Sequence, residues 1–224
     1  MSNDNVVSLH GVTLVGGGIL GGTDLAEAMA LAPTLVAADG GADHCVATGI
    51  SPVAVIGDMD SVGVRDALPD TRFIEIAEQE STDFEKSLTR IRAPFVLAVG
   101  FTGARLDHTL SVLSSLPKGI GPATLVLGRD DVIFAAPRHV TLDVEPGTRV
   151  SLYPLTQMTG RSKGLEWPIA GLELSPMGRI STSNRATGPV TLEFDTPGCL
   201  ILMPRAALRV ALAGLIGPDA VPGQ

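Results

Sequence analysis

Apolar runs alternate with stretches of helical spacing over the first part of the chain. The strand-like runs fall at 12–15, 34–38, 53–56, 72–76, 95–100 and 123–128, and stretches of helical spacing fall at 23–31, 42–49, 82–91 and 106–116. This alternation is typical of a mostly parallel sheet flanked by helices. We therefore predict an α/β domain over residues 1–135, whose ligands bind beyond the carboxyl ends of its strands.

From residue 136 the pattern changes to short alternating segments broken by Gly and Pro. Examples are 149–155, 164–169, 179–184 and 189–204. This pattern predicts an antiparallel β-sandwich over 136–224. The closing stretch 205–217 has helical spacing instead, so we expect a terminal helix that packs its Leu and Val face against the rest. The predicted fold class is α/β followed by an antiparallel β-sandwich.

Composition narrows the class of protein. The chain has 224 residues, of which 45% are hydrophobic, and a net charge of -8 without a long run of Lys or Arg, so nucleic-acid binding is disfavoured. The N-terminus lacks a basic region followed by a long apolar stretch, and no apolar run approaches the roughly 20 residues that span a bilayer. Cys45 and Cys199 lack metal-site spacing and are expected to be small buried residues. We predict a cytoplasmic protein that binds small molecules.

A glycine-rich turn follows the first long strand. Gly16, Gly18 and Gly21 have G-x-G-x-x-G spacing, and Asp39 closes the next strand, as in a dinucleotide-binding fingerprint. Glycines at these spacings also arise in a plain strand-to-helix turn, which is the interpretation that we favour. Many acidic residues follow later strands, and they would repel a cofactor that carries only a pyrophosphate.

Acidic residues follow several of the predicted strands. Asp58 and Asp60 lie two apart after an apolar run, so they point to one side of an extended segment and repel each other unless a cation lies between them. Further acids are Asp39, Asp43, Glu80, Asp83, Glu85 and Asp107. Such hard oxygen ligands suit Mg²⁺, whose remaining positions take phosphate oxygens. The sequence has no P-loop motif, so we expect the metal and scattered cations to hold the phosphates.

Each of these segments also has a simpler structural interpretation. Asp39 with the two following glycines is compatible with a turn. Thr82 suits a helix N-cap with acids in the first turn, and Lys86 suits a solvated ion pair with Asp83. Capping and surface charge would account for Arg105, Asp107 and His108. These interpretations leave unexplained why the acidic groups share one edge of the predicted sheet.

Six segments in order resemble the motif series of the thiamin pyrophosphokinase (thiamine diphosphokinase) family. They are "ADGGAD", "IGDMDS", "EQESTDFEKSL", "TGARLDHTL", "SKGLEWPI" and "RISTSN", and the resemblance covers roughly residues 12–203. It implies an α/β domain that binds ATP and Mg²⁺, and a sandwich that binds thiamine. It also implies a homodimer whose active sites form where the α/β domain of one subunit meets the sandwich of the other.

The implied reaction transfers the diphosphoryl group of ATP to the hydroxyl of thiamine, giving thiamine diphosphate and AMP. We expect Asp58 and Asp60 to hold Mg²⁺. Asp83 and Asp107 are then either further metal ligands or the carboxylate that accepts the hydroxyl proton. The alternative function is a non-catalytic nucleotide- or dinucleotide-binding protein.

The remaining candidates bind the two substrates. Lys86 and Arg105 are the expected cations on the phosphates. The nucleotide site is expected to be lined by Asp39, Gly40 and Gly41, with hydrogen bonds from Ser61, Gln79 and Thr82. On the thiamine side, Ser183 and Asn184 match the motif of the family, and Trp167 is either a core residue or a ring-stacking one. We expect a structural role for His108.

Overall fold

The computed structural model describes residues 4–59 and 64–223. It divides into two compact units, which are described separately. The first comprises Met1–Ser115 and Gly119–Arg129, and the second comprises Leu116–Lys118 and Asp130–Gln224. The described residues include no helix that is long and apolar enough to cross a membrane.

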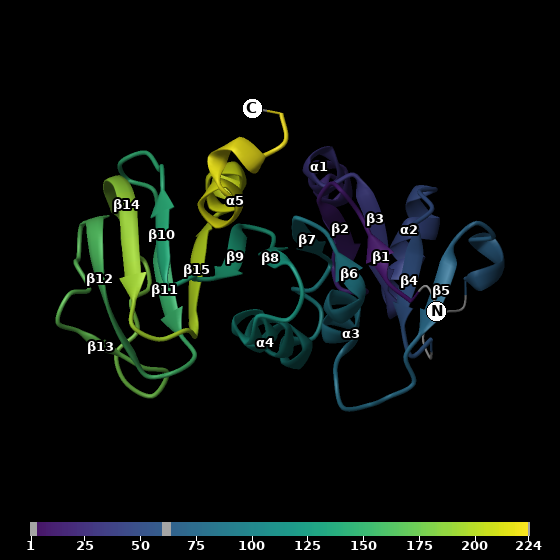
Figure 1. Ribbon diagram of the computed structural model, residues 1–224, viewed down its shortest axis with the longest axis horizontal. Coiled ribbons are helices and arrows are strands. Elements are labelled where there is room, and N and C mark those ends of the chain that lie inside the picture. The colour runs from purple at the N-terminus through teal and green to yellow at the C-terminus, as the bar shows by residue number, and fades with distance from the viewer. Residues whose placement is uncertain (1–3, 60–63, 224) are drawn as a thin grey trace. The chain divides into compact units, whose positions relative to one another are not determined.

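The first unit is built on parallel strands (Figure 1). They are β2 (Val12–Val15), β3 (Thr34–Ala38), β4 (Ala54–Gly57), β5 (Arg72–Glu75), β7 (Phe95–Val99) and β8 (Ala123–Leu127). Parallel pairing joins β3, β4 and β5, and likewise β2, β7 and β8. A hydrogen bond ties the start of β3 to the residue before β2, since Thr34 N donates to Gly11 O at 3.4 Å. A short parallel pair, β1 (Val6–Val7) with β6 (Ile91–Arg92), lies beside them.

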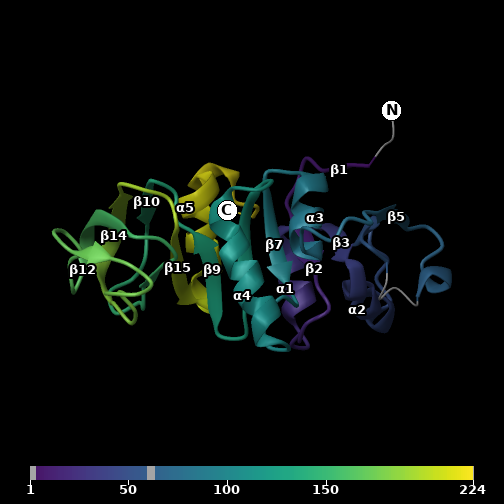
Figure 2. The ribbon, with the colours of Figure 1, turned by 90° about the horizontal axis from the view of Figure 1, so that it is seen from below.

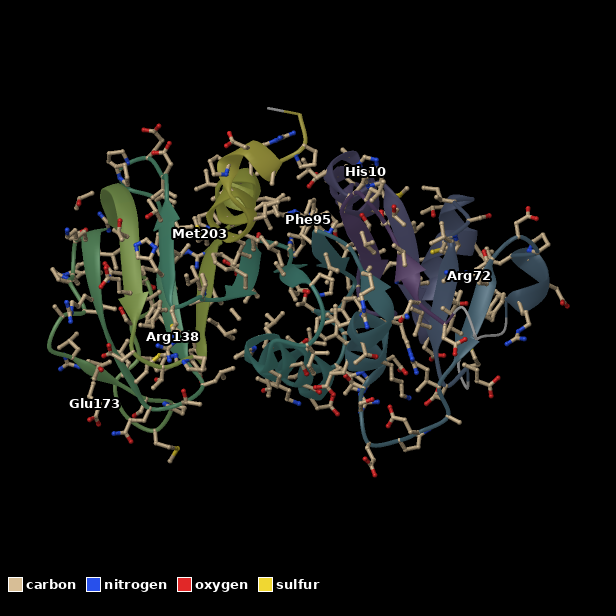
Figure 3. All side chains as sticks on the ribbon, in the orientation of Figure 1. His10, Arg72, Phe95, Arg138, Glu173 and Met203 are labelled. Carbon is tan, nitrogen blue, oxygen red and sulfur yellow. The ribbon has the colours of Figure 1, made fainter. Side chains whose placement is uncertain are left out.

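Most of these strands are apolar throughout because helices cover the parallel sheet. The helices are α1 (Asp24–Leu31), α2 (Ala42–Thr48), α3 (Asp83–Arg90) and α4 (Leu106–Ser115), with short 3₁₀ turns η1 (Asp39–Gly41) and η2 (Arg65–Ala67). Figure 2 shows α1 and α3 on opposite sides of the strands. Phe95 on β7 is only 1% exposed, and its side chain is labelled in Figure 3. The helices and strands lie close to the ranges that the sequence pattern predicts.

The second unit is antiparallel. One sheet has the order β10 (His139–Leu142), β14 (Ala186–Phe194), β12 (Met158–Leu165) and β13 (Glu173–Leu174). A second set pairs β15 (Cys199–Pro204) with β9 (Asp131–Ala135) on one side and β11 (Ser151–Pro154) on the other. The predicted fold class, a parallel α/β part followed by an antiparallel β part, is therefore confirmed. The sequence pattern had placed β9 with the first domain, whereas its partner β15 belongs to the second unit.

The chain closes with the predicted helix. This helix, α5 (Leu208–Ile216), packs on β10 and β15 and buries Leu208, Ala211 and Leu212. Short 3₁₀ turns, η4 (Arg205–Ala207) and η5 (Pro218–Ala220), flank it, and η3 (Leu116–Lys118) also belongs to this unit. Apolar spacing of three and four residues therefore identified this element correctly.

Candidate active site

A cavity of about 580 Å³ lies in the first unit, where several strands end. Its walls come from the turn after β2, the residues that follow β3, β4 and β7, and the first turns of α3 and α4. The predicted site residues that line it are Asp39, Gly40, Asp58, Gln79, Thr82, Asp83, Lys86 and Arg105. This is the edge of a parallel sheet at which ligands commonly bind.

A buried lysine lies between two of the predicted carboxylates. Lys86 Nζ is 3.5 Å from Asp58 Oδ2 and 3.4 Å from Asp83 Oδ1, and the Lys86 side chain is only 2% exposed. Burial disfavours the ammonium charge, but the charges of Asp83 and Asp58 outweigh it and raise the pKa of Lys86. Gln79 Nε2 also donates to Asp58 Oδ2 at 3.1 Å. Lys86 thus pairs with Asp83, but inside the pocket and not as the solvated pair of the simpler interpretation.

Asp39 contributes a third carboxylate, which is 7% exposed. Its Oδ1 is buried without a hydrogen-bond partner among the described residues. Its backbone has φ 41°, a region that L-residues rarely adopt. A Cβ built on Gly57 would lie 2.8 Å from Asp39 Cβ, so this conformation requires a glycine there. A strained residue with an unpaired buried oxygen is the kind of feature found at ligand sites.

The pKa of Asp83 is raised above its ordinary value. Burial is the largest cause, the charges of Asp39 and Asp58 add to it, and the charge of Lys86 opposes it. Asp83 therefore holds its proton more readily than a free carboxyl group does, and an added cation beside it would be favourable.

The cluster fits weak, substrate-assisted binding of Mg²⁺. Among the residues that the structure describes, no three acidic, His or Cys side chains converge closely enough to hold a metal by themselves. Mg²⁺ in phosphate-binding enzymes usually takes one or two carboxylates and completes its sphere with water and substrate oxygens. Asp58 and Asp83 provide such carboxylates, and the unpaired oxygen of Asp39 is near by in the same pocket. Asp60 and Ser61, which were also predicted to belong to the site, lie outside the described residues.

The first turn of α3 is fixed by a capping box. Thr82 Oγ1 accepts a hydrogen bond from Glu85 N at 3.3 Å, and Thr82 N donates to Glu85 Oε2 at 3.4 Å. Ser115 Oγ at the end of α4 donates to Glu85 Oε1 at 2.8 Å. The N-cap interpretation of Thr82 is therefore confirmed, and Thr82 also lines the pocket. The Ser115 bond joins α3, which carries Lys86, to α4, which begins directly after Arg105.

Arg105 and Asp107 form an exposed pair at the start of α4. Arg105 Nη2 donates to Asp107 Oδ2 at 2.6 Å, and this hydrogen bond is the main reason that the pKa of Asp107 falls to about 2. Asp107 is 66% exposed and is not among the lining residues, whereas Arg105 is. A carboxylate with so low a pKa is a weak proton acceptor.

The glycine-rich turn is the strand-to-helix turn favoured from the sequence, and it also lines the pocket. Gly16 N donates to Val99 O at 2.9 Å and Gly18 N to Gly100 O at 2.7 Å, so the turn is held by backbone bonds. Gly16, Gly17 and Gly18 also line the pocket. Gly41 does not line it, and a Cβ there would lie 2.1 Å from Val15 O, so Gly41 is needed for packing.

Several lining residues were not singled out as site residues. His108, Thr109 and Ser111 come from α4, which contributes more of the wall than its first residues suggested. Phe84 and Phe101 also line the pocket and form a ring pair with centroids 4.9 Å apart. Helical spacing from Arg105 would have indicated His108 and Thr109, because residues three and four apart share a face.

In the second unit, the three predicted thiamine-side residues lie close together. Trp167 N and O both hydrogen-bond to the side chain of Asn184, and Ser183 directly precedes Asn184. Trp167 is 54% exposed, which rules out the core interpretation of this residue. Asn184 is 2% exposed, and Ser183 has φ 58°.

Two family models match this chain. The model of the thiamin pyrophosphokinase catalytic domain matches residues 25–121, and that of the thiamin pyrophosphokinase vitamin B1 binding domain matches residues 139–199. The chain belongs to the thiamin pyrophosphokinase family. The catalytic model spans nearly all of the pocket residues, and the vitamin B1 model spans Trp167 and Asn184.

Named relatives of the family agree with this assignment. Thiamin pyrophosphokinase 1 of Caenorhabditis elegans is 28% identical over 153 residues, which cover 61% of this chain and 63% of the relative. Thiamine pyrophosphokinase 1 of Arabidopsis thaliana is 29% identical over 169 residues, or 65% and 62% of the two chains. The chain thus matches under two thirds of the length of these relatives. The structure of thiamin pyrophosphokinase from Candida albicans has a TM-score of 0.72 at 15% identity, covers 90% of this chain and 96% of its own, and shares its fold.

Proposed function

We propose that this chain is a thiamine diphosphokinase, which transfers the diphosphoryl group of ATP to the hydroxyl of thiamine and releases AMP. The observation that carries the proposal is the pocket in which Lys86 lies between Asp58 and Asp83 and which Asp39 also lines, in a chain that matches both the catalytic and the vitamin B1 binding models. Such a mixture of pocket carboxylates and a buried lysine suits a magnesium-bound polyphosphate better than an uncomplexed anion.

The reaction is a displacement at the β-phosphorus. The thiamine oxygen forms a bond to that phosphorus, the bond from it to the oxygen shared with the α-phosphorus breaks, and AMP leaves with that oxygen. Charge on the transferred group must be neutralised and the attacking oxygen aligned. Lys86 and Arg105 supply fixed positive charge on the pocket wall, and Arg105 offers a planar fork suited to two phosphate oxygens.

The hydroxyl proton needs an acceptor. Asp83 and Asp107 were equal candidates from the sequence. Asp83 lines the pocket and has a raised pKa, whereas Asp107 lies outside the lining and has a pKa of about 2. We therefore assign proton acceptance to Asp83 and the orientation of Arg105 to Asp107.

Mg²⁺ would be held by Asp58, with Asp60 as a further predicted ligand. When bound, it would neutralise phosphate charge and hold the diphosphate in line for attack. Asp39 would lie against the nucleotide with Gly40 and the Gly16–Gly18 turn, which allow close approach of backbone to ligand. Gln79 and Thr82, which also line the pocket, would add hydrogen bonds.

We further propose a homodimer with active sites at the subunit interface, and a cytoplasmic location. The two cysteines are free and buried, as suits a reducing compartment. Equilibrium sedimentation tests the dimer, and mixing two variants that are inactive for different reasons tests the shared sites. Activity that reappears on mixing requires sites built from two subunits.

An assay of AMP release from ATP tests the main proposal. It is run in the presence of Mg²⁺, with and without thiamine. Thiamine-dependent AMP release with equal formation of thiamine diphosphate is the expected result. The alternative, a non-catalytic nucleotide- or dinucleotide-binding protein, predicts tight ADP-ribose or NAD binding without Mg²⁺ and no AMP release. The acid cluster around Lys86 argues against that alternative.

A further inference from the structure

The segment that carries Trp167 leaves the sheet at the end of β12. Leu165 is the last residue of β12 to pair with β14, opposite Ala186. Glu166 N still donates to Arg185 O at 2.8 Å, and at Trp167 the side chain of Asn184 takes the place of a strand partner. Asn184 Oδ1 accepts from Trp167 N at 3.2 Å, and Asn184 Nδ2 donates to Trp167 O at 2.7 Å. The amide thus pairs with both backbone groups of one residue, as a neighbouring strand would.

The oxygen of the Asn184 amide is not available to a ligand. Its side chain is 2% exposed, and Oδ1 also accepts from Arg185 N at 2.9 Å, so both lone pairs of this oxygen are occupied. The backbone carbonyl of Asn184 accepts from Val150 N at 2.8 Å. A substrate would have to break these bonds inside the protein before it could reach the amide.

The backbone before Asn184 is also held in an unusual form. Ser183 has φ 58°, and its N–H donates to Ser151 Oγ at 2.9 Å. This left-handed turn directs the chain so that the next side chain points inward. A conformation that costs free energy persists only where surrounding bonds support it.

The side chain of Trp167, unlike that of Asn184, is open to solvent. Its backbone is tied at both polar groups, yet its side chain is 54% exposed. An aromatic ring on a fixed backbone loses little conformational entropy when a flat ligand covers it. A ring face also attracts a cation directly, and thiamine is a flat molecule with a permanent positive charge.

We infer that Asn184 is a positioning residue, which acts on thiamine only by fixing the backbone of Trp167 so that the indole is held ready for the cationic ring of the substrate. This inference rests on the proposed function and refines it. The motif resemblance had suggested direct substrate contact for Asn184. The hydrogen bonds of Asn184 favour an indirect role for this residue, and the exposed indole of Trp167 is the group left for direct contact.

The first test replaces Asn184 with Asp and, in parallel, with Ala. Asn184→Asp keeps the shape and the Oδ1 acceptor but loses the donor to Trp167 O, and Asn184→Ala loses both bonds. Removing a buried partner costs enough that we expect the KM for thiamine to rise about tenfold. The KM for ATP should stay within about twofold of the wild-type value, because the pocket of the first unit is untouched.

Because Trp167 is the only tryptophan of the sequence, its fluorescence reports directly on the pairing of Asn184 with the backbone of Trp167. Without any substrate, the variants should show faster acrylamide quenching and lower emission anisotropy than the wild type. Circular dichroism checks that they remain folded. Unchanged quenching in a folded variant would overturn the inference, whatever the reaction of the enzyme proves to be. Absence of thiamine-dependent AMP release by the wild type would instead refute the proposed function.

A double-mutant cycle separates positioning from contact. If Asn184 acts through Trp167, then adding Asn184→Asp to Trp167→Ala should change the thiamine KM by less than about twofold. A further tenfold rise on that background would mean that Asn184 contacts thiamine itself. Should neither Asn184 variant fold, Trp167→Ala alone decides, because an unchanged thiamine KM in it overturns the inference.

Ser162→Ala serves as the matched control. Ser162 Oγ accepts from Ile169 N at 3.1 Å, so this variant removes a bond to the same segment without touching the backbone of Trp167. We expect a thiamine KM within about twofold of the wild type. An effect equal to that of Asn184→Asp would show that general stability of the segment matters and not the pairing of Asn184 with Trp167, which would overturn the inference.

Discussion

The pocket of the first unit and the Trp167 segment of the second treat their buried polar groups differently. In the pocket, Asp39 keeps an unpaired oxygen, and Asp83 has a raised pKa in spite of its lysine neighbour. In the segment, every described bonding position of the Asn184 oxygen is filled by backbone N–H groups. The pocket thus stores unfavourable electrostatics that a ligand can relieve, whereas the segment uses satisfied bonds to hold one ring in place.

This contrast suggests two ways of preparing for a ligand. A polyphosphate with its metal brings both charges and hydrogen-bonding groups, so the protein gains by leaving carboxylates under-neutralised until binding. A flat cation such as thiamine brings few groups that must be matched, so the protein gains by fixing an aromatic surface. We therefore expect substitutions of the pocket carboxylates to separate activity from stability.

Asp58→Asn should have the largest effect. It removes the negative charge that faces Lys86 and that we assign to Mg²⁺, while it keeps the shape of the side chain. We expect AMP formation to fall by roughly 100-fold or more, as for other losses of a fixed charge that stabilises a transition state. Steady-state kinetics measure the loss, and circular dichroism checks the fold. Asp70→Asn, at an exposed position outside the pocket lining, is the control, and undiminished activity of Asp58→Asn would refute the metal assignment.

Asp83→Asn should lower activity while sparing stability. The native state raises the pKa of Asp83, chiefly by burial, so it binds the Asp83 proton more tightly than the unfolded chain does. As the pH rises above the ordinary Asp value of about 3.9, ionised Asp83 therefore costs wild-type stability, and Asn avoids that cost. We expect the variant to gain on the wild type in free energy of unfolding between acidic and neutral pH.

Urea unfolding at several pH values measures this difference. Below the ordinary pKa of Asp the two proteins should differ least, because Asp83 is then neutral in both states. A variant that becomes less stable than the wild type as the pH rises would show that the ion pair with Lys86 outweighs burial. Such an outcome would contradict the view that the pocket of the first unit, unlike the Trp167 segment, holds polar groups at a cost to stability.

The sequence predicted the acidic side of the pocket well because the position of these acids follows from the geometry of a parallel sheet. Parallel strands end at one edge, so acids that directly follow β3 and β4 had to lie near each other, as Asp39 and Asp58 do. The capping pattern from Thr82 to Glu85 is local and could be read from spacing alone. The helical tail followed from apolar spacing in the same way.

The rest depended on contacts that spacing does not encode. The sequence could not indicate that Lys86 would lie between Asp58 and Asp83, since Asp58 is distant from Lys86 in the chain. Nor could it separate Gly40, which lines the pocket, from Gly41, which packs against Val15. The use of the Asn184 amide on Trp167 likewise depends on a register between β12 and β14 that only the folded structure gives.

Gly41→Ala should have a moderate effect and act on stability. The added Cβ would lie 2.1 Å from Val15 O, a backbone atom that cannot move away freely. Overpacking of this kind costs about 1–3 kcal/mol, which urea unfolding at neutral pH can resolve. Gly22→Ala is the matched control, because a Cβ there meets nothing within 4 Å. Normal stability combined with weak ATP binding in Gly41→Ala would instead support the ligand role expected from the sequence.

Asp107→Asn should have the smallest effect on catalysis. Arg105 holds the pKa of Asp107 at about 2, so this carboxylate stays ionised over the whole range in which an enzyme assay is possible. Its loss should free Arg105 and weaken ATP binding by about twofold to fivefold, the range of a weakened exposed pair. The acid limb of the pH profile for kcat should not move, because that limb belongs to a group with a higher pKa, and we assign it to Asp83. A loss of kcat as large as that of Asp58→Asn, with an unchanged KM for ATP, would transfer the role of proton acceptor from the pocket wall to this exposed residue.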